Sequence, residues 1–389
     1  MSEVEEWTPP TVSGIGVPRV TPATSGNQKI EGDFPLDQVV IDQLPPGTQV
    51  HSCDRYGASA WTITARITTT LADGTPKLYF LKCAEEDQGK AMLEGEFHSM
   101  SELYKTAPNF VPEPYTWGQL NTTNPETYYF LCDFIEMLTE NPDPVQLCTK
   151  LVQLHQASES PTGQFGFHIN TCQGNLPQQT AWNPSWMAFY IQLLKGAMQL
   201  NREINGVWKD LDPLVDRLIT HVVPQLLGPL EADGRVVKPT LIHGDLWDGN
   251  IGTDFETGEI YTFDASVYYA HYEMEIAMWR AKFCKILTSK VYLNTYLSRM
   301  GISEPAEQFE DRHRLYSCYM LLHESACHNG SSFREQCYET LNYLVDKYAP
   351  FPEEASGESE TLATSLSRLT TVDKHLDSVV VAVSGVESN

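Results

Sequence analysis

The stretch LIHGDLWDGN, residues 241–250, is the most informative part of this 389-residue chain. Asp245 comes two residues after His243, and Asn250 comes five residues after Asp245. A further aspartate, Asp264, follows fourteen residues after Asn250, at the end of the apolar run IYTF. A carboxylate can take a proton from a hydroxyl group, and carboxylate and amide oxygens are hard ligands of the kind that Mg²⁺ prefers. The spacing therefore predicts a site that handles both a proton and a divalent cation.

The same order and spacing occur in the catalytic loop of protein kinases, which has His-Arg where this chain has His243-Gly244. Phosphoryl transfer requires an acceptor hydroxyl held in line, a carboxylate to accept its proton, and magnesium held by oxygen ligands. Asp245 is the predicted catalytic base, and Asn250 and Asp264 are the predicted magnesium ligands. The alternative, a polar turn with a capping aspartate, leaves the order of these residues as a coincidence.

Charge narrows the range of partners. The chain has 26 basic and 51 acidic residues, which gives a net charge of −25 at pH 7. This excess of acid opposes binding to nucleic acid or to an anionic membrane, so neither is expected as a partner. It suits a cationic or amine-bearing substrate, and a global charge does not exclude a local basic pocket for ATP.

We expect a cytoplasmic protein from the cysteines and the N-terminal segment. Nine cysteines are scattered along the chain, none in a Cys-x-x-Cys pair, which favours reduced core thiols over a disulfide framework. The N-terminal MSEVEEWTPP is acidic and lacks the apolar segment of a signal peptide. No apolar stretch approaches the roughly 20 residues needed to span a bilayer.

A hairpin is expected early in the chain. Residues 61–70, WTITARITTT, alternate between apolar and polar side chains, which is typical of a strand. The Asp-Gly pair in LADGTPK favours a turn, and LYFLKCA, residues 78–84, predicts the second strand. Lys82 lies in this second strand, where a lysine is costly unless it is paired or at a sheet edge.

A partner for Lys82 is expected on the following segment, GKAMLEGEFHSMSELYK, residues 89–105. Its apolar residues recur at helical spacing, with Glu96 beside the apolar stripe and Glu94 on the other side. An inward glutamate after a strand lysine matches the kinase ion pair that positions the lysine on the ATP phosphates. We therefore predict that Lys82 and Glu96 act together in nucleotide binding and that Glu94 faces water. The alternative is an edge lysine and a glutamate that merely flanks the stripe.

Two further segments are candidates for nucleotide contacts. SCDRYGASAW, residues 52–61, is expected to be a loop; it holds one glycine, Gly57, and is a weak match to a phosphate-binding loop. Ser59 and the backbone N–H groups near Gly57 are predicted to cover the phosphates. YYFLCDFIEM, residues 128–137, is typical of a buried strand that leads into a hinge. The backbone groups expected to meet adenine are those of Asp133, Phe134 and Ile135.

Helix signals dominate the rest of the chain. Asn183-Pro184 and Asp212-Pro213 combine an N-cap residue with a first-turn proline, so each is predicted to open a helix. Residues 273–348 are also predicted to be helical. Short strands are expected at TLIH and EIYTFD, one on each side of the catalytic loop.

Beyond the catalytic loop, several motifs resemble the fructosamine/ketosamine-3-kinase family. They are QFGFHINTCQGNLPQQTAWNPSWMAFY, HGDLWDGN, DASVYYAHYEMEIA and HNGSSFREQ. HGD alone is typical of kinase-like proteins, whereas HGDLW-x-GN with FGFH upstream points to this family. The resemblance runs from about residue 57 to residue 348. The family belongs to the aminoglycoside-phosphotransferase branch of the kinase-like fold.

The resemblance implies the same base, metal and ATP-anchoring residues as the spacing does. It adds a sugar-holding role for Trp247. His243, in the same loop, is also expected to contact the substrate. Glu275 resembles the acidic residue that braces the catalytic loop from the next helix.

The expected fold is α+β, two-lobed and kinase-like, with a small β-rich N-lobe that carries one key helix and a larger, mostly helical C-lobe. Residues 1–30, rich in Pro, Thr, Ser and Gly, are expected to form a flexible arm. We expect the nucleotide-binding N-lobe at residues 31–135, the catalytic and substrate-binding C-lobe at 136–350, and a tail at 351–389.

The implied reaction is transfer of the γ-phosphoryl group of ATP, with Mg²⁺, to the 3-hydroxyl of a ketosamine. A ketosamine is a sugar adduct, such as a ribulosamine or fructosamine, on a protein or a small amine. Phosphorylation makes the adduct unstable, so deglycation repair is the implied role. Two alternatives stay open: an aminoglycoside- or choline-type small-molecule kinase of the same fold, and a non-catalytic pseudokinase. A pseudokinase usually lacks at least one of four residues that are all present here: Lys82, Asp245, Asn250 and Asp264.

Overall fold

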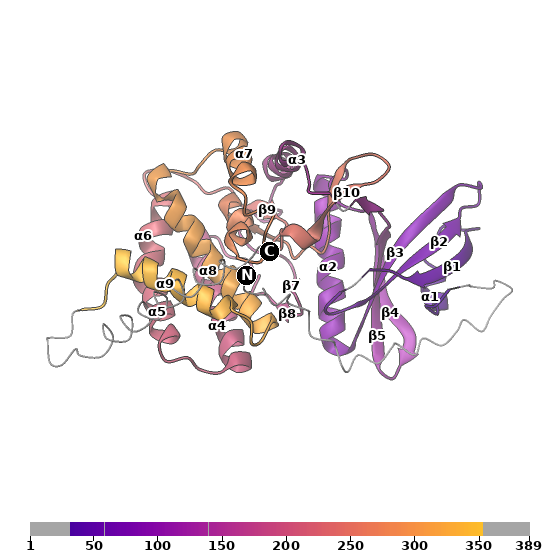
Figure 1. The fold of residues 1–389 in the computed structure, drawn as a ribbon, viewed down its shortest axis with the longest axis horizontal. Coiled ribbons are helices and arrows are strands. Elements are labelled where there is room, and N and C mark those ends of the chain that lie inside the picture. Colours follow the sequence, from indigo (N-terminus) through magenta and orange to yellow (C-terminus); the bar gives the residue numbers. More distant parts are fainter. Residues whose placement is uncertain (1–31, 58, 139, 353–389) are drawn as a thin grey trace, which may run out of the picture. The chain divides into compact units, whose positions relative to one another are not determined.

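A computed structural model describes residues 32–57, 59–138 and 140–352. The expected N-terminal arm, residues 1–30, lies outside the described residues, and so does the expected tail beyond residue 352. The described residues up to Ala349 belong to one compact unit (Figure 1). Within this unit an antiparallel sheet with one long helix precedes a mostly helical part, as expected for the α+β class.

The sheet has five antiparallel strands in the order β1-β2-β3-β5-β4. They are β1 (Gln49–Arg55), β2 (Ile63–Thr70), β3 (Pro76–Glu85), β4 (Pro114–Thr123) and β5 (Glu126–Asp133). The predicted hairpin is confirmed as β2 and β3, with Thr64 opposite Lys82. Because β3 is the middle strand, Lys82 is not an edge residue. The expected loop over residues 52–61 is wrong at its start, since residues 52–55 pair with β2 and belong to β1.

Two hydrophobic cores cover the two faces of this sheet. Tyr129 and Leu131 of β5 face one core, and Phe130 and Cys132 face the other, because successive strand side chains point to opposite sides. The helices next to the sheet are α1 (Gln38–Ile41) and α2 (Glu86–Thr106). Residues of α1 close the first core, whereas α2 lies in the second, which continues into the helical part.

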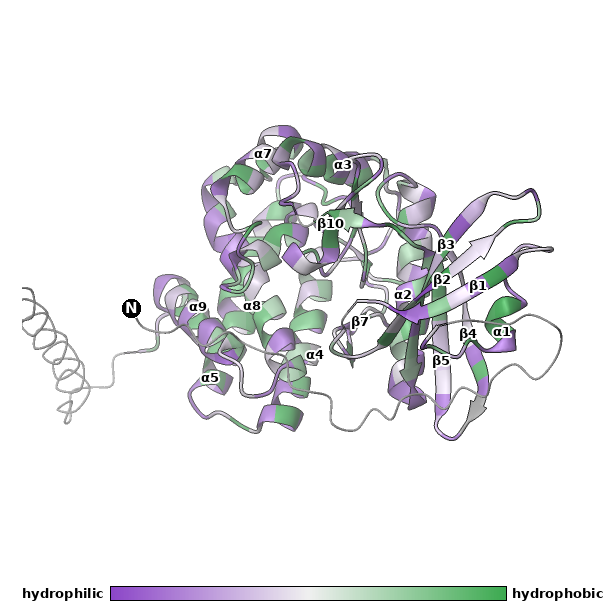
Figure 2. Ribbon diagram, turned by 45° about the vertical axis from the view of Figure 1, so that its right-hand side comes forward, coloured by the Kyte–Doolittle hydropathy of each residue, from purple (hydrophilic) through white to green (hydrophobic). Residues whose placement is uncertain are grey.

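The helical part contains seven α-helices among the described residues. They are α3 (Pro144–Ala157), α4 (Trp186–Asn205), α5 (Leu211–Arg217), α6 (Val223–Leu227), α7 (Lys290–Met300), α8 (Phe309–Cys327) and α9 (Phe333–Tyr348). The other helical segments are the π-helix η1 (Leu218–Val222) and the 3-10 helices η2 (Gly228–Glu231), η3 (Asp248–Asn250), η4 (Tyr272–Arg280) and η5 (Ala306–Gln308). Polar and apolar segments alternate along α9 in Figure 2, as expected for a helix with one buried face.

Two predicted helix starts are displaced. α4 begins at Trp186 with Ser185 as its N-cap, not at Asn183. The Asn183 side chain instead accepts the N–H of Ser185 at 3.0 Å, and its backbone bonds to Phe165, so this residue belongs to a turn before the helix. α5 begins at Leu211, one residue before the predicted Asp212 cap.

Short strands frame the catalytic loop. They are β6 (Met137–Leu138), β7 (Cys172–Gln173), β8 (Leu176–Pro177), β9 (Thr240–Ile242), β10 (Ile251–Asp254), β11 (Ile260–Thr262) and β12 (Tyr268–Ala270). β10 pairs with β6 and β11, and β9 pairs with β12. The loop of residues 243–250 therefore connects two strands that belong to different small sheets, and Asp264 follows the end of β11.

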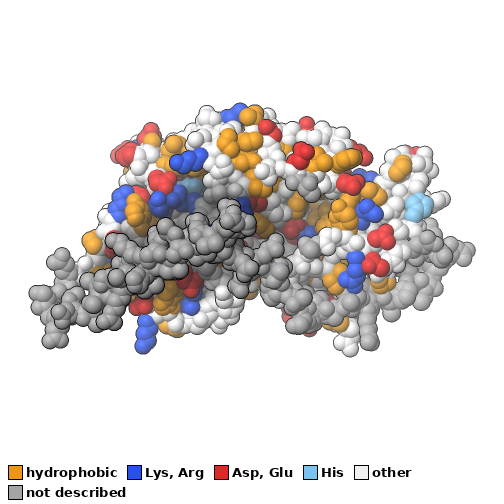
Figure 3. Space-filling model, viewed as in Figure 1, with side chains coloured by type: hydrophobic (Ala, Val, Ile, Leu, Met, Phe, Trp, Pro, Cys, Tyr) orange, Lys and Arg blue, Asp and Glu red, His pale blue; other side chains and the backbone are white. Residues whose placement is uncertain are grey.

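In Figure 3, acidic and basic side chains are interspersed over the face in view. Within the described part of the chain, no helix combines the length and the apolar character that crossing a membrane requires.

Candidate active site

Glu275 and Gly244 determine the shape of the catalytic loop, residues 243–250. The Glu275 carboxylate, on η4, accepts the backbone N–H of His243 at 2.6 Å and that of Gly244 at 3.2 Å. Gly244 has a φ of +80°, and a Cβ at this position would collide with the carbonyl oxygen of Ser266. Only glycine fits such a position. The contacts of Glu275 agree with the bracing role that the resemblance implies.

His243 is buried at 1% exposure, and both of its ring nitrogens have partners within the protein. Nδ1 accepts the N–H of Asp245 at 3.3 Å, so Nε2 carries the proton and donates it to the carbonyl oxygen of Phe263 at 3.0 Å. Burial lowers the pKa of His243 and favours this neutral form. His243 therefore ties the catalytic loop to the segment that precedes Asp264, and its expected contact with substrate stays a prediction.

The Asp245 carboxylate is held by Asn250. The Asn250 Nδ2 group donates to the backbone oxygen of Asp245 at 2.9 Å and to its Oδ2 at 3.0 Å. Burial raises the pKa of Asp245 well above its ordinary value, and the charges of Glu324 and Asp264 raise it further. Hydrogen bonds from Asn250 and Gln173 act in the opposite direction. A raised pKa makes this carboxylate a better proton acceptor than an exposed aspartate.

Lys82 forms the predicted ion pair with Glu96. Its Nζ lies 2.7 Å from Glu96 Oε1, and it also bonds to the Asp264 carboxylate. Burial alone would lower the pKa of Lys82, but the charges of Asp264 and Glu96 raise it above its ordinary value. Burial also raises the pKa of Glu96, and Lys82 opposes that rise. The structure thus joins the sheet, α2 and the segment after β11 at one buried cation.

Asn250 and Asp264 stand at the adjoining ends of two paired strands, β10 and β11. The Phe263 N–H donates to the Asn250 carbonyl oxygen at 3.1 Å, and Asp264 adopts a φ of +58°, which is uncommon for any residue but glycine. Asn250 uses its amide nitrogen on Asp245, which leaves its Oδ1 as an acceptor, and Asp264 offers carboxylate oxygen. This donor set fits Mg²⁺, which takes few protein ligands together with phosphates and water. The described residues contain no group of three or more His, Cys, Asp or Glu side chains arranged to hold a metal.

The expected hinge contacts the glycine-bearing loop. The Phe134 ring packs edge-on against Tyr56, with centroids 4.8 Å apart, and the Arg66 guanidinium lies 5.6 Å from the Tyr56 ring centre. The N–H groups of Asp133 and Phe134 bond to Glu113 and Leu78. Ile135 is thus the hinge residue whose N–H has no partner among the described residues.

The loop residues Gly57 and Ser59 lie between β1 and β2, beside Tyr56. The Ser59 oxygen accepts the N–H groups of Trp61 and Thr62, so it closes a turn within the loop. Both residues therefore lie in the loop that joins β1 to β2, and their contact with phosphates stays a prediction.

Trp247 is half-buried at the rim of the catalytic loop. Its indole lies across Gly249, where a Cβ would collide with the ring, and it packs edge-on against Phe283 with centroids 5.4 Å apart. Asp248 fixes the neighbouring segment, because its carboxylate accepts the N–H groups of Ile286 at 2.8 Å and Leu287 at 2.9 Å. A partly exposed indole beside Asp245 agrees with a sugar-holding role, which stays a prediction.

Two residues that interact with Asp245 were not predicted from the sequence. Gln173, on β7, is fully buried and donates to Glu324 on α8 at 2.9 Å. Their signal was weak: Gln173 lies in the motif TCQGN, and Glu324 is a lone acid in the mostly apolar run MLLHESAC. Neither has a spacing that predicts contact with the catalytic loop.

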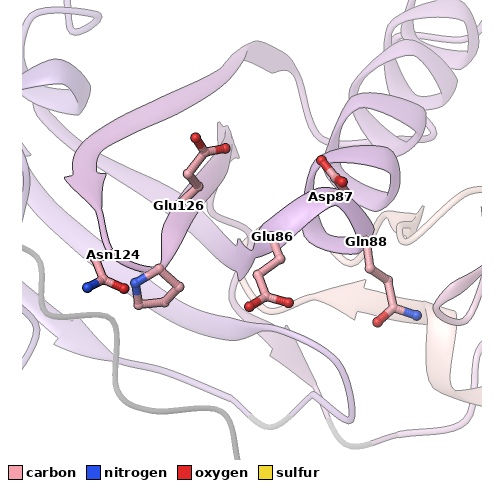
Figure 4. A pocket seen from close by; sticks show the side chains of 6 residues that line it. Glu86, Asp87, Gln88, Asn124 and Glu126 are labelled. Atoms are coloured by element: carbon pink, nitrogen blue, oxygen red, sulfur yellow. The ribbon is translucent and has the colours of Figure 1, made fainter.

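A separate hollow of about 630 Å³ lies at the start of α2 (Figure 4). Its lining residues are Glu86, Asp87, Gln88, Asn124, Pro125 and Glu126. None of them belongs to the site described above, so the hollow is not part of the candidate active site.

Three features match the parts of a kinase-like phosphotransferase. They are a buried lysine–glutamate pair, an aspartate in a His-Gly-Asp loop, and the oxygen-bearing side chains of Asn250 and Asp264 at the adjoining ends of two paired strands. The family model described as fructosamine kinase matches residues 59–367, and the chain belongs to this family.

Individual relatives agree with this membership. A chloroplastic protein-ribulosamine 3-kinase of Oryza sativa subsp. indica is 31% identical over 262 residues, which cover 67% of this chain and 69% of the relative. A crystal structure from Haemophilus somnus 129PT, provisionally assigned as a fructosamine-3-kinase, has a TM-score of 0.62 at 19% identity and covers 79% of this chain and 96% of its own. A thermostable mutant of aminoglycoside phosphotransferase APH(4)-Ia, in complex with AMP-PNP and hygromycin B, has a TM-score of 0.53 at 14% identity, with coverage of 80% and 98%. The two structural likenesses confirm the kinase-like fold.

Proposed function

We propose that this chain is an ATP-dependent ketosamine 3-kinase, which phosphorylates the 3-hydroxyl of a sugar adduct on an amine. Family membership supports the reaction class, and the rice relative supports the acceptor class by its name. The observation that carries the proposal is the site itself: Asp245 held by Asn250, with Lys82 paired to Glu96 and bonded to Asp264.

Each side chain then has a distinct task. Lys82 binds the α- and β-phosphates of ATP, and Glu96 keeps its ammonium in place. Asp245 accepts the proton of the 3-hydroxyl as that oxygen attacks the γ-phosphorus. Asn250 and Asp264 would hold magnesium, which neutralises phosphate charge when bound.

The product determines the biological role that we propose. A ketosamine phosphorylated at its 3-hydroxyl is unstable and releases the amine, so the reaction would repair glycated proteins or glycated small amines. The compartment stays a prediction: the scattered cysteines favour the cytoplasm, whereas the name of the rice relative places that protein in the chloroplast.

The two alternatives are less well supported. The aminoglycoside phosphotransferase shares 14% identity, so its likeness extends to the fold and not to its substrate. A pseudokinase reading conflicts with the assembled Lys82, Glu96 and Asp264 cluster.

Release of ADP tests the proposal directly. Purified protein would be incubated with ATP and Mg²⁺ and, in parallel, a ribulosamine, a fructosamine and an aminoglycoside. We expect ADP release with a ketosamine, and none from the Asp245→Asn variant under the same conditions. Turnover of the aminoglycoside alone would replace the proposal by the small-molecule alternative, and no turnover of any acceptor would refute it.

A further inference from the structure

A second carboxylate, Glu324, lies beside the catalytic base. Its side chain projects from α8 and is largely buried, with a residue exposure of 7%. Glu324 Oε1 accepts the amide N–H of Gln173 at 2.9 Å, and Oε2 lies 3.3 Å from Nε2 of His328. The charge of Glu324 raises the pKa of Asp245, and the Gln173 side chain, which bonds to Glu324, also interacts with Asp245.

Gln173 interacts with both carboxylates, and its side-chain oxygen, Oε1, is left without a hydrogen-bond donor among the described residues. Its amide nitrogen donates to Glu324, and the Gln173 side chain also stabilises the charged form of Asp245, which lowers the pKa of that carboxyl. Both neighbours are acceptors, so the amide must turn its nitrogen to them and its oxygen away. Gln173 is fully buried, and among the described residues its Oε1 has no hydrogen-bond donor. A buried acceptor without a donor is unfavourable unless a ligand supplies one.

The described site holds more carboxylate than cation. The ammonium of Lys82 is bound by Glu96 and Asp264, so it does not serve Glu324. The basic group that contacts Glu324 is His328, whose ring is cationic only when protonated. A buried carboxylate is stabilised by a cation or by several donors, so the pair of Asp245 and Glu324 favours a cationic ligand.

Half-buried rings link this carboxylate to the predicted sugar platform. His328 lies 5.5 Å from Trp61 and 5.9 Å from Phe333, measured between ring centroids. Phe333 lies 5.2 Å from Phe283, which in turn contacts Trp247. Such an arc offers apolar surface to a sugar ring, with acid beside it.

We propose that Glu324, assisted by Gln173 Oε1, binds the protonated amine of the acceptor and so selects ketosamines over neutral sugars. The inference rests on the proposed function and names the group that recognises its substrate class. In a ketosamine the amine is on the first carbon of the sugar and the reacting hydroxyl is on the third. An acceptor whose hydroxyl meets Asp245 therefore brings its amine to a neighbouring position, and Glu324 is such a neighbour through the shared Gln173 amide.

The test compares two acceptors that differ in charge. One is a ribulosamine with its basic secondary amine, and the other is the same compound acylated on that nitrogen, which is neutral. Glu324→Gln should lower kcat/KM for the amine roughly ten- to hundredfold, the range for a hydrogen bond to a charged group. Loss of the Glu324 charge also alters the pKa of Asp245, and this effect is common to both acceptors. The kcat/KM for the neutral acceptor should therefore fall by that common, smaller factor alone, and the KM for ATP should stay unchanged.

Two variants accompany Glu324→Gln. Glu324→Asp keeps the charge but shortens the side chain, so its preference for the amine should lie between those of the wild type and Glu324→Gln. Glu307→Gln, an exposed change just before α8, should behave as wild type. Equal losses for both acceptors in Glu324→Gln, or no loss for either, would overturn the assignment.

Calorimetry separates this inference from the proposed function. Binding of the two acceptors would be measured in the presence of AMP-PNP, which requires no turnover. A wild type that turned over neither acceptor would refute the kinase proposal. The difference in affinity between the amine and the neutral acceptor would still test whether Glu324 binds the amine. If Glu324→Gln binds the amine as tightly as wild type does, the inference is wrong. Melting temperatures of all variants identify any that fail to fold.

Discussion

Asp245 illustrates how much of this site depends on single atoms. Its Oδ2 accepts the Asn250 amide at 3.0 Å, and the Gln173 side chain lowers its pKa. Replacing the carboxylate by an amide keeps the size of the side chain and removes the proton acceptor. A substitution of Asp245 is therefore the most specific test of the proposed chemistry.

We expect Asp245→Asn to lower kcat by about 10²–10⁴-fold, the range for loss of a general base, while ATP binding is retained. Steady-state kinetics and calorimetry with AMP-PNP would measure the two quantities. Asp233→Asn, at a side chain with 82% exposure, serves as the control and should be silent. A variant that retains more than half of the wild-type kcat would remove Asp245 from its role.

Gly244 gives a second prediction at this scale. Gly244→Ala must accommodate both a positive φ and a collision with the Ser266 carbonyl, so the loop should be displaced and activity lost. Gly258→Ala is the matched control, because Gly258 has a φ of +71° but no atom within 4 Å of its Cβ position. We expect about 1–2 kcal/mol of destabilisation for Gly258→Ala and more for Gly244→Ala, measured by chemical denaturation. Equal losses would show that the collision is relieved at no cost.

Among the elements, α2 connects the parts of the site. It carries Glu96 to Lys82, and Gly95 allows close packing, because a Cβ there would lie 3.3 Å from Thr171 Cα. On the same helix, the Ser99 hydroxyl accepts the N–H of Val267 at 3.2 Å, in the segment after Asp264. Figure 1 shows the long helix α2 beside the strands of the sheet. A change in the position of this helix would therefore move several parts of the site together.

The phase of α2 is testable with two glutamates. Glu96→Gln should raise the KM for ATP and lower kcat, because Lys82 loses its charged partner. Glu94 is half-buried rather than fully exposed as expected, but no hydrogen bond or ion pair of its side chain is seen among the described residues. Glu94→Gln should therefore stay within about 0.5 kcal/mol of wild type in stability and leave kinetics unchanged. Similar kinetic defects in both variants would contradict the observed phase.

Across the whole molecule, buried histidines link stability to pH. Burial lowers the pKa of His271, His313 and His323 to about 4 in each case. An unfolded histidine has a pKa of about 6.5, so between pH 6.5 and about 4 the unfolded state binds more protons than the folded state. Their contribution to stability is therefore complete above pH 6.5 and is lost as the pH falls through this window. Asp245 and Glu96, whose pKa values are raised, act in the opposite direction.

The contribution of one histidine, His313, to the pH dependence of stability can be measured separately. His313 Nε2 bonds to the carbonyl oxygen of Ile276 at 2.7 Å, a contact that the amide of glutamine can reproduce. On acidification from pH 6.5 to pH 5, His313→Gln should lose less stability than wild type, by up to about 1.4 kcal/mol per pH unit. Denaturant unfolding at several pH values would measure the two slopes. Identical slopes would mean that His313 takes up its proton equally in both states.

Local sequence patterns were sufficient to predict several elements and site residues of this protein. Alternation along residues 61–70 predicted β2, because a strand with one buried face repeats every two residues. Helical spacing in α2 placed Glu96 on the side of Lys82, since residues three and four apart share a helix face. The order of His, Asp, Asn and Asp located the catalytic loop and the strands around it. Each of these signals is complete within a short segment of sequence.

Packing between distant segments decided the rest. Residues 52–55 became a strand because β2 pairs with them, and His243 became a brace because two loops enclose it. Gln173 and Glu324 are 151 residues apart, and α8 is buried on all sides from Leu315 to Cys327, so the periodicity of its sequence could not show which face meets the site. The sequence by itself determined which groups we propose for the chemistry. Only the tertiary structure decided which other groups lie beside them, because those contacts depend on the packing of whole elements.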